Sequence, residues 1–354
     1  MAHPRQPGRI TSLDGLRAIS IVLVLASHLD GTGGYPAQGV RALLGDFGHL
    51  GVQIFFVISG FLITLLLMQE QRSGGIALGR FYLRRALRLA PAFIAFLLAM
   101  MIATSLSWAH LTLVDIVAAA TYTVNYLPHR AWEIGHLWSL SVEEQFYLIW
   151  PLALLRISAR KRLMALALVM FLAAPVLRAA MRLTIVDPDL RDLEVFPAVA
   201  DAISIGCLMA LGRERLLRWP AYRALTGSWT LWLTLPFIAV INRYNGFVLI
   251  DLLGAPLALI MLAVIIEACT RLEHGPLDTL LNCQPVVFVG VLSYSLYLWQ
   301  QPFLNRHSAA AACQFPVNLA LVVLVALVSY FLIEKPLLAL RHRWAVAPRV
   351  AAIP

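Results

Sequence analysis

The chain is dominated by apolar segments whose lengths match the thickness of a membrane. A helix of about 20 apolar residues crosses a bilayer core of about 30 Å. Segments close to this length run from Leu13 to Leu29, His49 to Met68, Ala90 to Trp108, Leu137 to Leu155, Leu163 to Met181, Phe196 to Leu211, Ser228 to Ile241, Gly246 to Ala268, Pro285 to Leu304 and Pro316 to Ile333. Because backbone groups inside a membrane need internal hydrogen bonds, such continuous apolar runs form helices. The sequence predicts an all-α fold, a polytopic integral membrane bundle of about ten transmembrane helices.

The composition supports a membrane protein and argues against a nucleic-acid-binding protein and against a disulfide or metal framework. Hydrophobic residues make up 60% of the chain and charged residues 13%, far from the averages of soluble domains. The formal net charge of +9 does not indicate nucleic-acid binding, because the basic residues form short clusters between apolar runs. The four cysteines (Cys207, Cys269, Cys283 and Cys313) have no CxxC spacing, so we expect no disulfides and no metal site. Membrane lipid is therefore an expected partner, and nucleic acid is not.

Loop charges predict how the helices are oriented. Arginines concentrate in the loops at Gln69 to Leu89, Arg156 to Arg162 and Gly212 to Arg223, whereas the loop from Asp187 to Glu194 is acidic. By the positive-inside rule, the three basic loops are cytoplasmic, and both termini are cytoplasmic too. Counting the shorter apolar window at Leu111 to Leu127 as a span would reverse the predicted orientation of every later helix and place the Arg156 to Arg162 loop outside. We therefore expect that window to lie on the outer face.

The chain is predicted to form a single transmembrane domain over residues 1–354, with a helical core at about 13–336 and short cytoplasmic tails. No repeat or linker indicates an appended soluble domain. The basic first residues lead into an apolar stretch without a small-residue cleavage pattern, so we expect this stretch to be a retained span. We expect a multi-pass protein of a bacterial-type inner (plasma) membrane.

Ionisable residues form a stripe along the first predicted helix. Asp14, Arg17 and His28 point in similar directions, because a step of 11 residues returns to within about 20° on a helix. Arg17 and His28 are about 16 Å apart along the axis. An arginine near a membrane face is often an anchor, with Asp14 as its partner at the helix start. A histidine inside a membrane helix, in contrast, indicates function.

A basic cluster precedes the third predicted helix and contains Arg80, Arg84, Arg85 and Arg88. Arg85 and Arg88 are neighbours on one face at i and i+3. Such clusters commonly set orientation and bind lipid headgroups. Guanidinium groups also suit phosphate oxygens, as a nucleotide-bearing donor requires. The spacing alone leaves both interpretations open.

Two adjacent carboxylates, Glu143 and Glu144, stand at the head of the fourth apolar segment. A carboxylate in hydrocarbon is costly unless it is paired, hydrated or neutralised, which makes it a candidate for a functional site. Glu144 alternatively faces water or caps the helix. His136 lies at the same boundary and is a weaker candidate, with a purely interfacial position as the alternative. A histidine and a carboxylate together supply the groups needed for proton transfer from an alcohol.

Six sequence blocks then carry a family resemblance. They are LDGLRAISIVLVLASH (Leu13 to His28), GVQIFFVISGFLIT (Gly51 to Thr64), FYLRRALRLAP (Phe81 to Pro91), HLWSLSVEEQFYLIWP (His136 to Pro151), SYSLYLWQQPF (Ser293 to Phe303) and IEKP (Ile333 to Pro336). In this order, across nearly the whole chain, they resemble the membrane-bound acyltransferase family 3. The members of that family O-acylate surface sugars and some antibiotics.

The resemblance implies specific residue roles. The family's arginine and histidine pair falls on Arg17 and His28, its RxxR motif on Arg85 and Arg88, and its motif glutamate on Glu143. Asp201 resembles the family's aspartate before a glycine, although Val199 stands where an arginine is often found. Gln300 occupies a position where a histidine is common.

The resemblance also implies a reaction. Acyl groups, commonly acetyl, pass from cytoplasmic acyl-CoA, a donor substrate rather than a permanently bound cofactor, to a hydroxyl at the outer face. Arg17, Arg85 and Arg88 would hold the phosphates of coenzyme A, while His28 acts as general base and Glu143 stabilises the imidazolium. An acyl-histidine intermediate is a second route. The expected acceptor is a surface polysaccharide or glycolipid, with a macrolide-like secondary metabolite as the alternative.

Two other functional classes compete with this interpretation. Intramembrane histidine, glutamate and arginine also build proton-coupled secondary transporters, although no inverted repeat is apparent in the sequence. A structural or partner-binding membrane subunit would explain the apolar segments but not ionisable residues aligned at several depths. The enzyme is favoured over both, largely because of the family blocks.

Overall fold

The computed structural model describes residues 10–40, 45–244 and 247–344, and within them every regular element is helical. The α-helices are α1 (Thr11–Leu29), α3 (Phe47–Arg72), α4 (Leu78–Ser105), α5 (Leu113–Ala120), α6 (Leu137–Arg156), α7 (Arg160–Thr184), α8 (Pro188–Arg191), α9 (Phe196–Val199), α10 (Asp201–Leu216), α11 (Pro220–Gly227), α12 (Thr234–Arg243), α13 (Ala255–Thr270), α14 (Pro276–Asn282), α15 (Gln284–Phe303), α16 (Val317–Ser329) and α17 (Lys335–Trp344). π-Helical turns at Ile250–Gly254 and Tyr330–Glu334 precede α13 and α17. The all-α prediction is confirmed for this part of the chain. The expected retention of the basic amino-terminal residues and the expected cytoplasmic termini fall on residues 1–9 and 345–354, outside the described residues.

Among the described residues, six helices, or helices continued through a π-helical turn, are long and apolar enough to cross a membrane: Thr11–Leu29, Phe47–Arg72, Leu78–Ser105, Arg160–Thr184, Ile250–Thr270 and Val317–Ala339. Two bent pairs, Pro220–Gly227 with Trp229–Arg243 and Pro276–Asn282 with Gln284–Phe303, raise the number to eight if each pair is one span. The other two predicted spans correspond to α6 and α10. The first carries Glu143 and Glu144, and the second has only 16 residues. The count of ten stays a prediction.

The window at Leu111 to Leu127 does not form a membrane-spanning helix. Helix α5 covers only 8 residues, about 12 Å, which is too short to cross a bilayer. The turn that follows α5 packs inside the bundle, where Asn125 is fully buried. Gln145 of α6 donates hydrogen bonds to the Tyr122 carbonyl (2.8 Å) and to Asn125 Oδ1 (2.9 Å). The expected position of this window on the outer face of the membrane stays a prediction.

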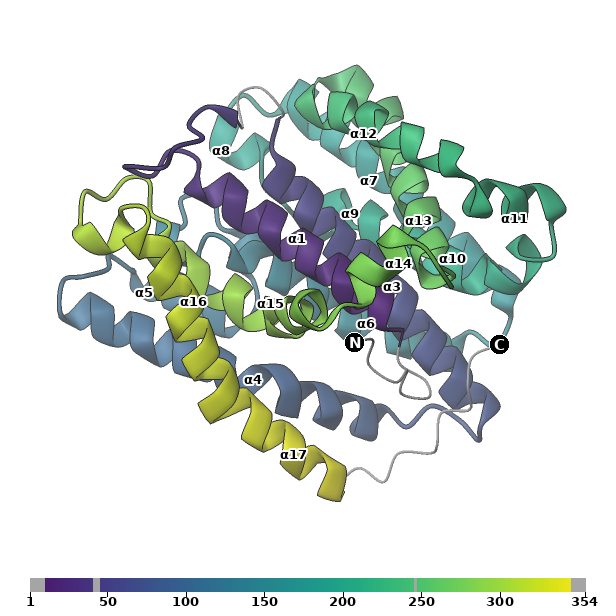
Figure 1. Cartoon of the computed structure of the whole chain (residues 1–354), viewed down its shortest axis with the longest axis horizontal. Helices are drawn as coiled ribbons and strands as arrows, with labels where there is room; N and C mark the ends of the chain where they lie inside the picture. Colours follow the sequence, from purple (N-terminus) through teal and green to yellow (C-terminus); the bar gives the residue numbers. More distant parts are fainter. Residues whose placement is uncertain (1–9, 41–44, 245–246, 345–354) are drawn as a thin grey trace.

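Helix α1 lies at the centre of the bundle and packs on both α3 and α15, while α3 also packs on α10 (Figure 1). The contact between α3 and α10 is close because small residues face each other. A Cβ added to Gly60 would lie 2.1 Å from the Ile203 carbonyl oxygen, and one added to Gly206 would lie 2.2 Å from the Val57 carbonyl oxygen. Small residues allow such close backbone approach in membrane helices. These glycines therefore fix the distance between the two helices.

We expect Gly60→Ala to destabilise the protein by about 1–3 kcal/mol, because the new methyl group meets a backbone carbonyl that cannot rotate away. Thermal unfolding of the purified protein, followed by size-exclusion chromatography in one detergent, measures the effect. Gly79→Ala is the matched control, since a Cβ there meets nothing within 4 Å. Equal melting temperatures for the two variants would show that the α3 and α10 backbones separate without cost.

The predicted basic loops meet at one end of the bundle. Glu214 of α10 accepts hydrogen bonds from Arg72 at the end of α3 (2.6 Å) and from Arg160 at the start of α7 (3.0 Å). Three loops predicted to share one membrane face are thus joined by one carboxylate. The opposite end of the bundle contains the starts of α3, α6 and α10 and the end of α7. We call these the basic end and the opposite end.

Candidate active site

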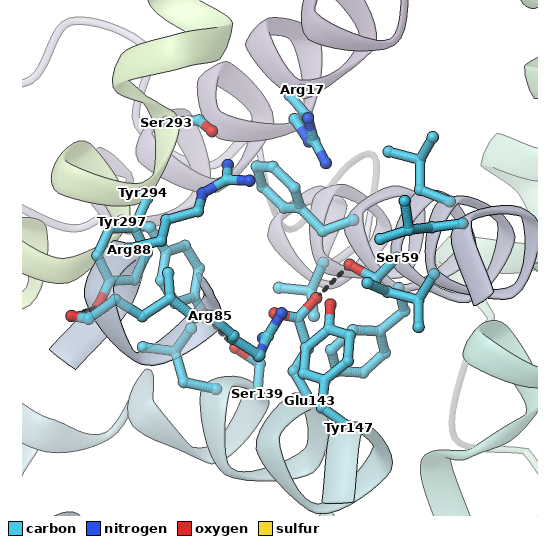
Figure 2. A pocket seen from close by; sticks show the side chains of 18 residues that line it. Arg17, Ser59, Arg85, Arg88, Ser139, Glu143, Tyr147, Ser293, Tyr294 and Tyr297 are labelled. Carbon is cyan, nitrogen blue, oxygen red and sulfur yellow. Dashed lines mark hydrogen bonds between the residues drawn. The ribbon is translucent and has the colours of Figure 1, made fainter. Parts of the chain in front are cut away.

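A cavity of about 350 Å³ lies inside the bundle, between α1, α3, α4, α6 and α15. Its polar lining residues are Arg17, Ser59, Arg85, Arg88, Ser139, Glu143, Tyr147, Ser293, Tyr294 and Tyr297. Figure 2 shows the three arginines around the open centre, with Glu143 and Ser59 facing each other at one side. Four of the predicted site residues, Arg17, Arg85, Arg88 and Glu143, therefore come together from three helices. We call this space the arginine cavity.

Glu143 is held from the neighbouring helix α3. Ser59 Oγ donates a hydrogen bond of 2.6 Å to Glu143 Oε1, and the Ser59 side chain is buried (Figure 2). The positive charges of Arg85 and Arg17 also attract the Glu143 carboxylate. A hydrogen-bond donor and two nearby positive charges thus accompany this carboxylate inside the bundle, where an acid group needs partners.

Arg85 is fixed in place by two residues of α6. Its Nε and Nη2 donate to Glu144 Oε1 at 3.0 Å and 2.9 Å, and its guanidinium carbon lies 3.0 Å from the centre of the Tyr147 ring. Glu144 is the eighth residue of α6, so the suggestion that it caps this helix is wrong. Instead, it orients an arginine of the cavity, and the stacking on Tyr147 adds a cation–π contact.

The other arginines of the predicted stripe and cluster also have defined places. Arg17 Nη1 lies 3.2 Å from Asp14 Oδ1, so the expected partnership at the start of α1 is present. Arg84 forms an ion pair with Glu70 of α3, while Arg80 is exposed. Arg85 and Arg88 are thus the members of the cluster that line the cavity. With Arg17, they bring three guanidinium groups to the cavity, where Glu143 is the lining carboxylate and Asp14 and Glu144 pair with Arg17 and Arg85.

His28 lies next to a different part of α15. Its Nδ1 is 3.1 Å from Gln300 Oε1, and its ring makes an edge contact with Trp132 at 6.3 Å. Gln300 follows Tyr297, which lines the arginine cavity, by one helical turn, or about 5 Å. His28 therefore has Gln300 as a partner and Glu143 has Ser59, neither of which the sequence analysis assigned.

The wall between these two places is built by hydrogen bonds. The Tyr297 hydroxyl lies 2.6 Å from Ser139 Oγ and donates to the His136 carbonyl at 3.0 Å. His136 itself is 3% exposed, and its Nε2 lies 3.0 Å from the Leu298 carbonyl. His136 therefore ties the start of α6 to α15 inside the bundle, and its expected position at the membrane boundary stays a prediction.

Asp201 belongs to another part of the molecule. It is 3% exposed at the start of α10, and its Oδ2 lies 2.6 Å from Arg178 Nη2. Arg178 of α7 therefore pairs with Asp201, whereas position 199, where the family often has an arginine, is a valine. Sequence reasoning missed Arg178, because a single arginine inside a predicted span gives no sign of its partner. It also missed Ser59 and Tyr297, whose only signal was a polar group inside an apolar segment.

Comparison with known proteins agrees with the resemblance of the six blocks. Residues 10–334 match the model of a family described as an acyltransferase domain. The chain belongs to this acyltransferase family. The matched range contains α1 to α16 and therefore every residue of the arginine cavity.

Three relatives have names that describe O-acetyl transfer. The chain is 27% identical over 373 residues to the peptidoglycan O-acetyltransferase OatA of Listeria monocytogenes, covering 93% of this chain and 56% of that protein. It is 29% identical to YrhL of Bacillus subtilis (strain 168), a candidate peptidoglycan O-acetyltransferase, covering 95% and 56%. A candidate O-acetyltransferase of Staphylococcus aureus (strain COL) is 29% identical, covering 92% and 57%. The chain thus spans about half the length of these relatives. No solved structure matches.

Proposed function

We propose that the protein is an integral membrane O-acyltransferase. It moves an acyl group, commonly acetyl, from cytoplasmic acyl-CoA to a hydroxyl of a carbohydrate or glycolipid at the outer face of a bacterial-type plasma membrane. The observation that carries the proposal is the arginine cavity inside a chain of the acyltransferase family. The names of the relatives support acetyl as the group and a carbohydrate as the acceptor.

The guanidinium groups of the arginine cavity support an anionic donor. Three arginines line the cavity, and although Arg17 and Arg85 also contact Asp14 and Glu144, guanidinium forks keep further donors that bind phosphate oxygens in pairs. Arg85 is already oriented by Glu144 and Tyr147, so little side-chain entropy is lost when it binds an anion. The phosphates of coenzyme A fit this chemistry. Its extended pantetheine arm then directs the thioester past Tyr297 towards His28.

His28 is the proposed general base. With Nδ1–H donating to Gln300 Oε1, Nε2 is the ring nitrogen that carries the lone pair, and it is the proposed proton acceptor. The acceptor oxygen attacks the thioester carbon while its proton moves to Nε2. The carbon–sulfur bond then breaks, and the imidazolium returns the proton to the coenzyme A thiolate. In the alternative route, Nε2 attacks the thioester carbon, the carbon–sulfur bond breaks and coenzyme A leaves as the thiolate. The acceptor hydroxyl then attacks the acyl-histidine, which returns the imidazole, and its proton goes to the thiolate.

Release of coenzyme A from labelled acetyl-CoA tests the proposed function. The whole chain is assayed in lipid nanodiscs with and without a sugar acceptor, and mass spectrometry detects any acetylated sugar. Acceptor-dependent release together with one added acetyl unit is the expected result. Proton-coupled flux of a solute in sealed vesicles, without release of coenzyme A, would instead identify a transporter.

Gln300 is expected to act as a positioning residue for His28. Gln300→Leu removes the acceptor of the Nδ1 hydrogen bond, so we expect kcat to fall about tenfold while KM for acetyl-CoA stays the same. Gln300→His restores a ring nitrogen that accepts this bond and should keep more activity. Steady-state kinetics of both variants measure the difference. Equal losses in the two would mean that residue 300 only fills space.

A further inference from the structure

A second cavity, of about 360 Å³, lies at the opposite end of the bundle. It is lined by the starts of α3, α6 and α10, the end of α7 and the loop before α9. We call it the end cavity. It shares Val52 and Phe56 of α3 with the arginine cavity, and both side chains are buried. The two cavities therefore lie one after the other along α3, separated by these side chains.

Aromatic and polar side chains combine in the end cavity. The ring of His49 stacks on Trp138 with centroids 6.0 Å apart and planes 15° from parallel, and Phe56 meets Trp138 edge-on at 6.0 Å. Within the described ranges, the side chains of Gln53, His49 and Trp138 make no hydrogen bond to protein. Each is partly exposed, so their donors and acceptors are open to a ligand in the cavity.

The charges of the end cavity balance. Arg178, Arg182 and Arg191 line it together with Asp192, Glu194 and Asp201. Most of these groups are already paired: Arg178 with Asp201 at 2.6 Å, Arg182 with Asp192 at 3.2 Å, and Glu194 with Arg130 of the loop before α6 at 2.9 Å. An anion would gain little in a space where each positive charge faces a carboxylate.

A ligand that suits the end cavity is uncharged and rich in hydroxyl groups. Paired arginines and carboxylates keep further donors and acceptors for hydroxyl groups, and an amide such as that of Gln53 both donates and accepts. The apolar face of an aromatic ring suits the C–H face of a sugar. Small-molecule sites generally combine such apolar walls with a few convergent polar groups.

We propose that the end cavity binds a sugar ring of the acceptor, an uncharged hexose or N-acetylhexosamine unit, through Trp138, His49 and Gln53. This inference rests on the proposed function, and it separates the two substrates in space. The anionic donor occupies the arginine cavity, and the neutral acceptor occupies the end cavity next to it along α3. An acceptor site at the end opposite the basic loops also agrees with transfer to the outer face.

Binding of chitotetraose, a neutral N-acetylglucosamine oligomer, tests this inference on the whole chain in detergent. We expect saturation-transfer NMR to detect binding, and titration should give an affinity higher than that of the anionic trigalacturonate. Gln53→Ala and Trp138→Leu should each raise the Kd for chitotetraose about tenfold and leave acetyl-CoA binding unchanged. The matched controls are Gln71→Ala, at an exposed position of the same helix, and Trp108→Leu, whose side chain is 79% exposed.

Several outcomes would overturn the assignment of the end cavity. Chitotetraose affinity unaffected by either cavity variant would place the sugar elsewhere, and tighter binding of trigalacturonate would contradict the neutral ligand. A protein that binds and hydrolyses acetyl-CoA but binds neither oligosaccharide would refute the sugar site and leave the proposed function standing. Absence of both acetyl-CoA binding and coenzyme A release would refute the proposed function itself.

Discussion

His28→Ala should lower kcat for acyl transfer about 10² to 10⁴-fold, the usual contribution of a positioned general base. The imidazole held by Gln300 is the proton acceptor in the proposed reaction, and alanine leaves no group to replace it. Because an intramembrane histidine is costly rather than stabilising, the variant should still insert and fold. Release of coenzyme A in nanodiscs measures kcat, and the thermal melting of the purified protein reports folding.

The control for this variant is His274→Ala, at an exposed position between α13 and α14, which should retain full activity. Normal turnover of His28→Ala would remove His28 from the reaction. Single-turnover labelling with radioactive acetyl-CoA separates the two chemical routes. Labelled protein that depends on His28 would support the acyl-histidine, whereas acetyl transfer without labelled protein would support direct attack by the acceptor.

The sequence predicted the class of fold well, because apolar length is a local property of the chain. Helices α1, α3 and α7 cover their predicted windows with only a few residues added at the ends. The window at Leu111 to Leu127 shows what apolar length does not reveal. Its Tyr122 carbonyl and Asn125 side chain accept hydrogen bonds from Gln145 of α6. Periodicity gives the face of a helix and not the neighbour that this face meets.

In the candidate site, too, single-helix patterns were read from the sequence, whereas contacts between helices were not. Arg17, Arg85 and Arg88 line one cavity, whereas the donor-binding role expected of them stays a prediction. The partners of His28 and Glu143 were not predicted, because Gln300 and Ser59 are single polar residues in apolar segments. Which polar residues meet across helices depends on close packing at small residues, as between α3 and α10, and one sequence does not reveal that register.

The arginine cavity yields the second large expected effect. Replacing Arg85 and Arg88 together by glutamine should raise KM for acetyl-CoA about 100-fold, because charge-assisted hydrogen bonds to phosphate are lost at two side chains. Replacing both by lysine keeps the positive charge that sets orientation but removes the guanidinium fork. The lysine variant should insert normally and still raise KM about tenfold. Initial rates at varied acetyl-CoA concentration give both values.

Arg80→Gln provides the matched control, since Arg80 is exposed on the same helix and does not line the cavity. Its KM should equal that of the wild type. If the lysine and glutamine variants both kept the wild-type KM, the arginines would serve only to orient α4 in the membrane. A raised KM in the glutamine variant alone would mean that charge suffices, so the paired hydrogen bonds that Glu144 and Tyr147 prepare at Arg85 would have no role in holding the donor.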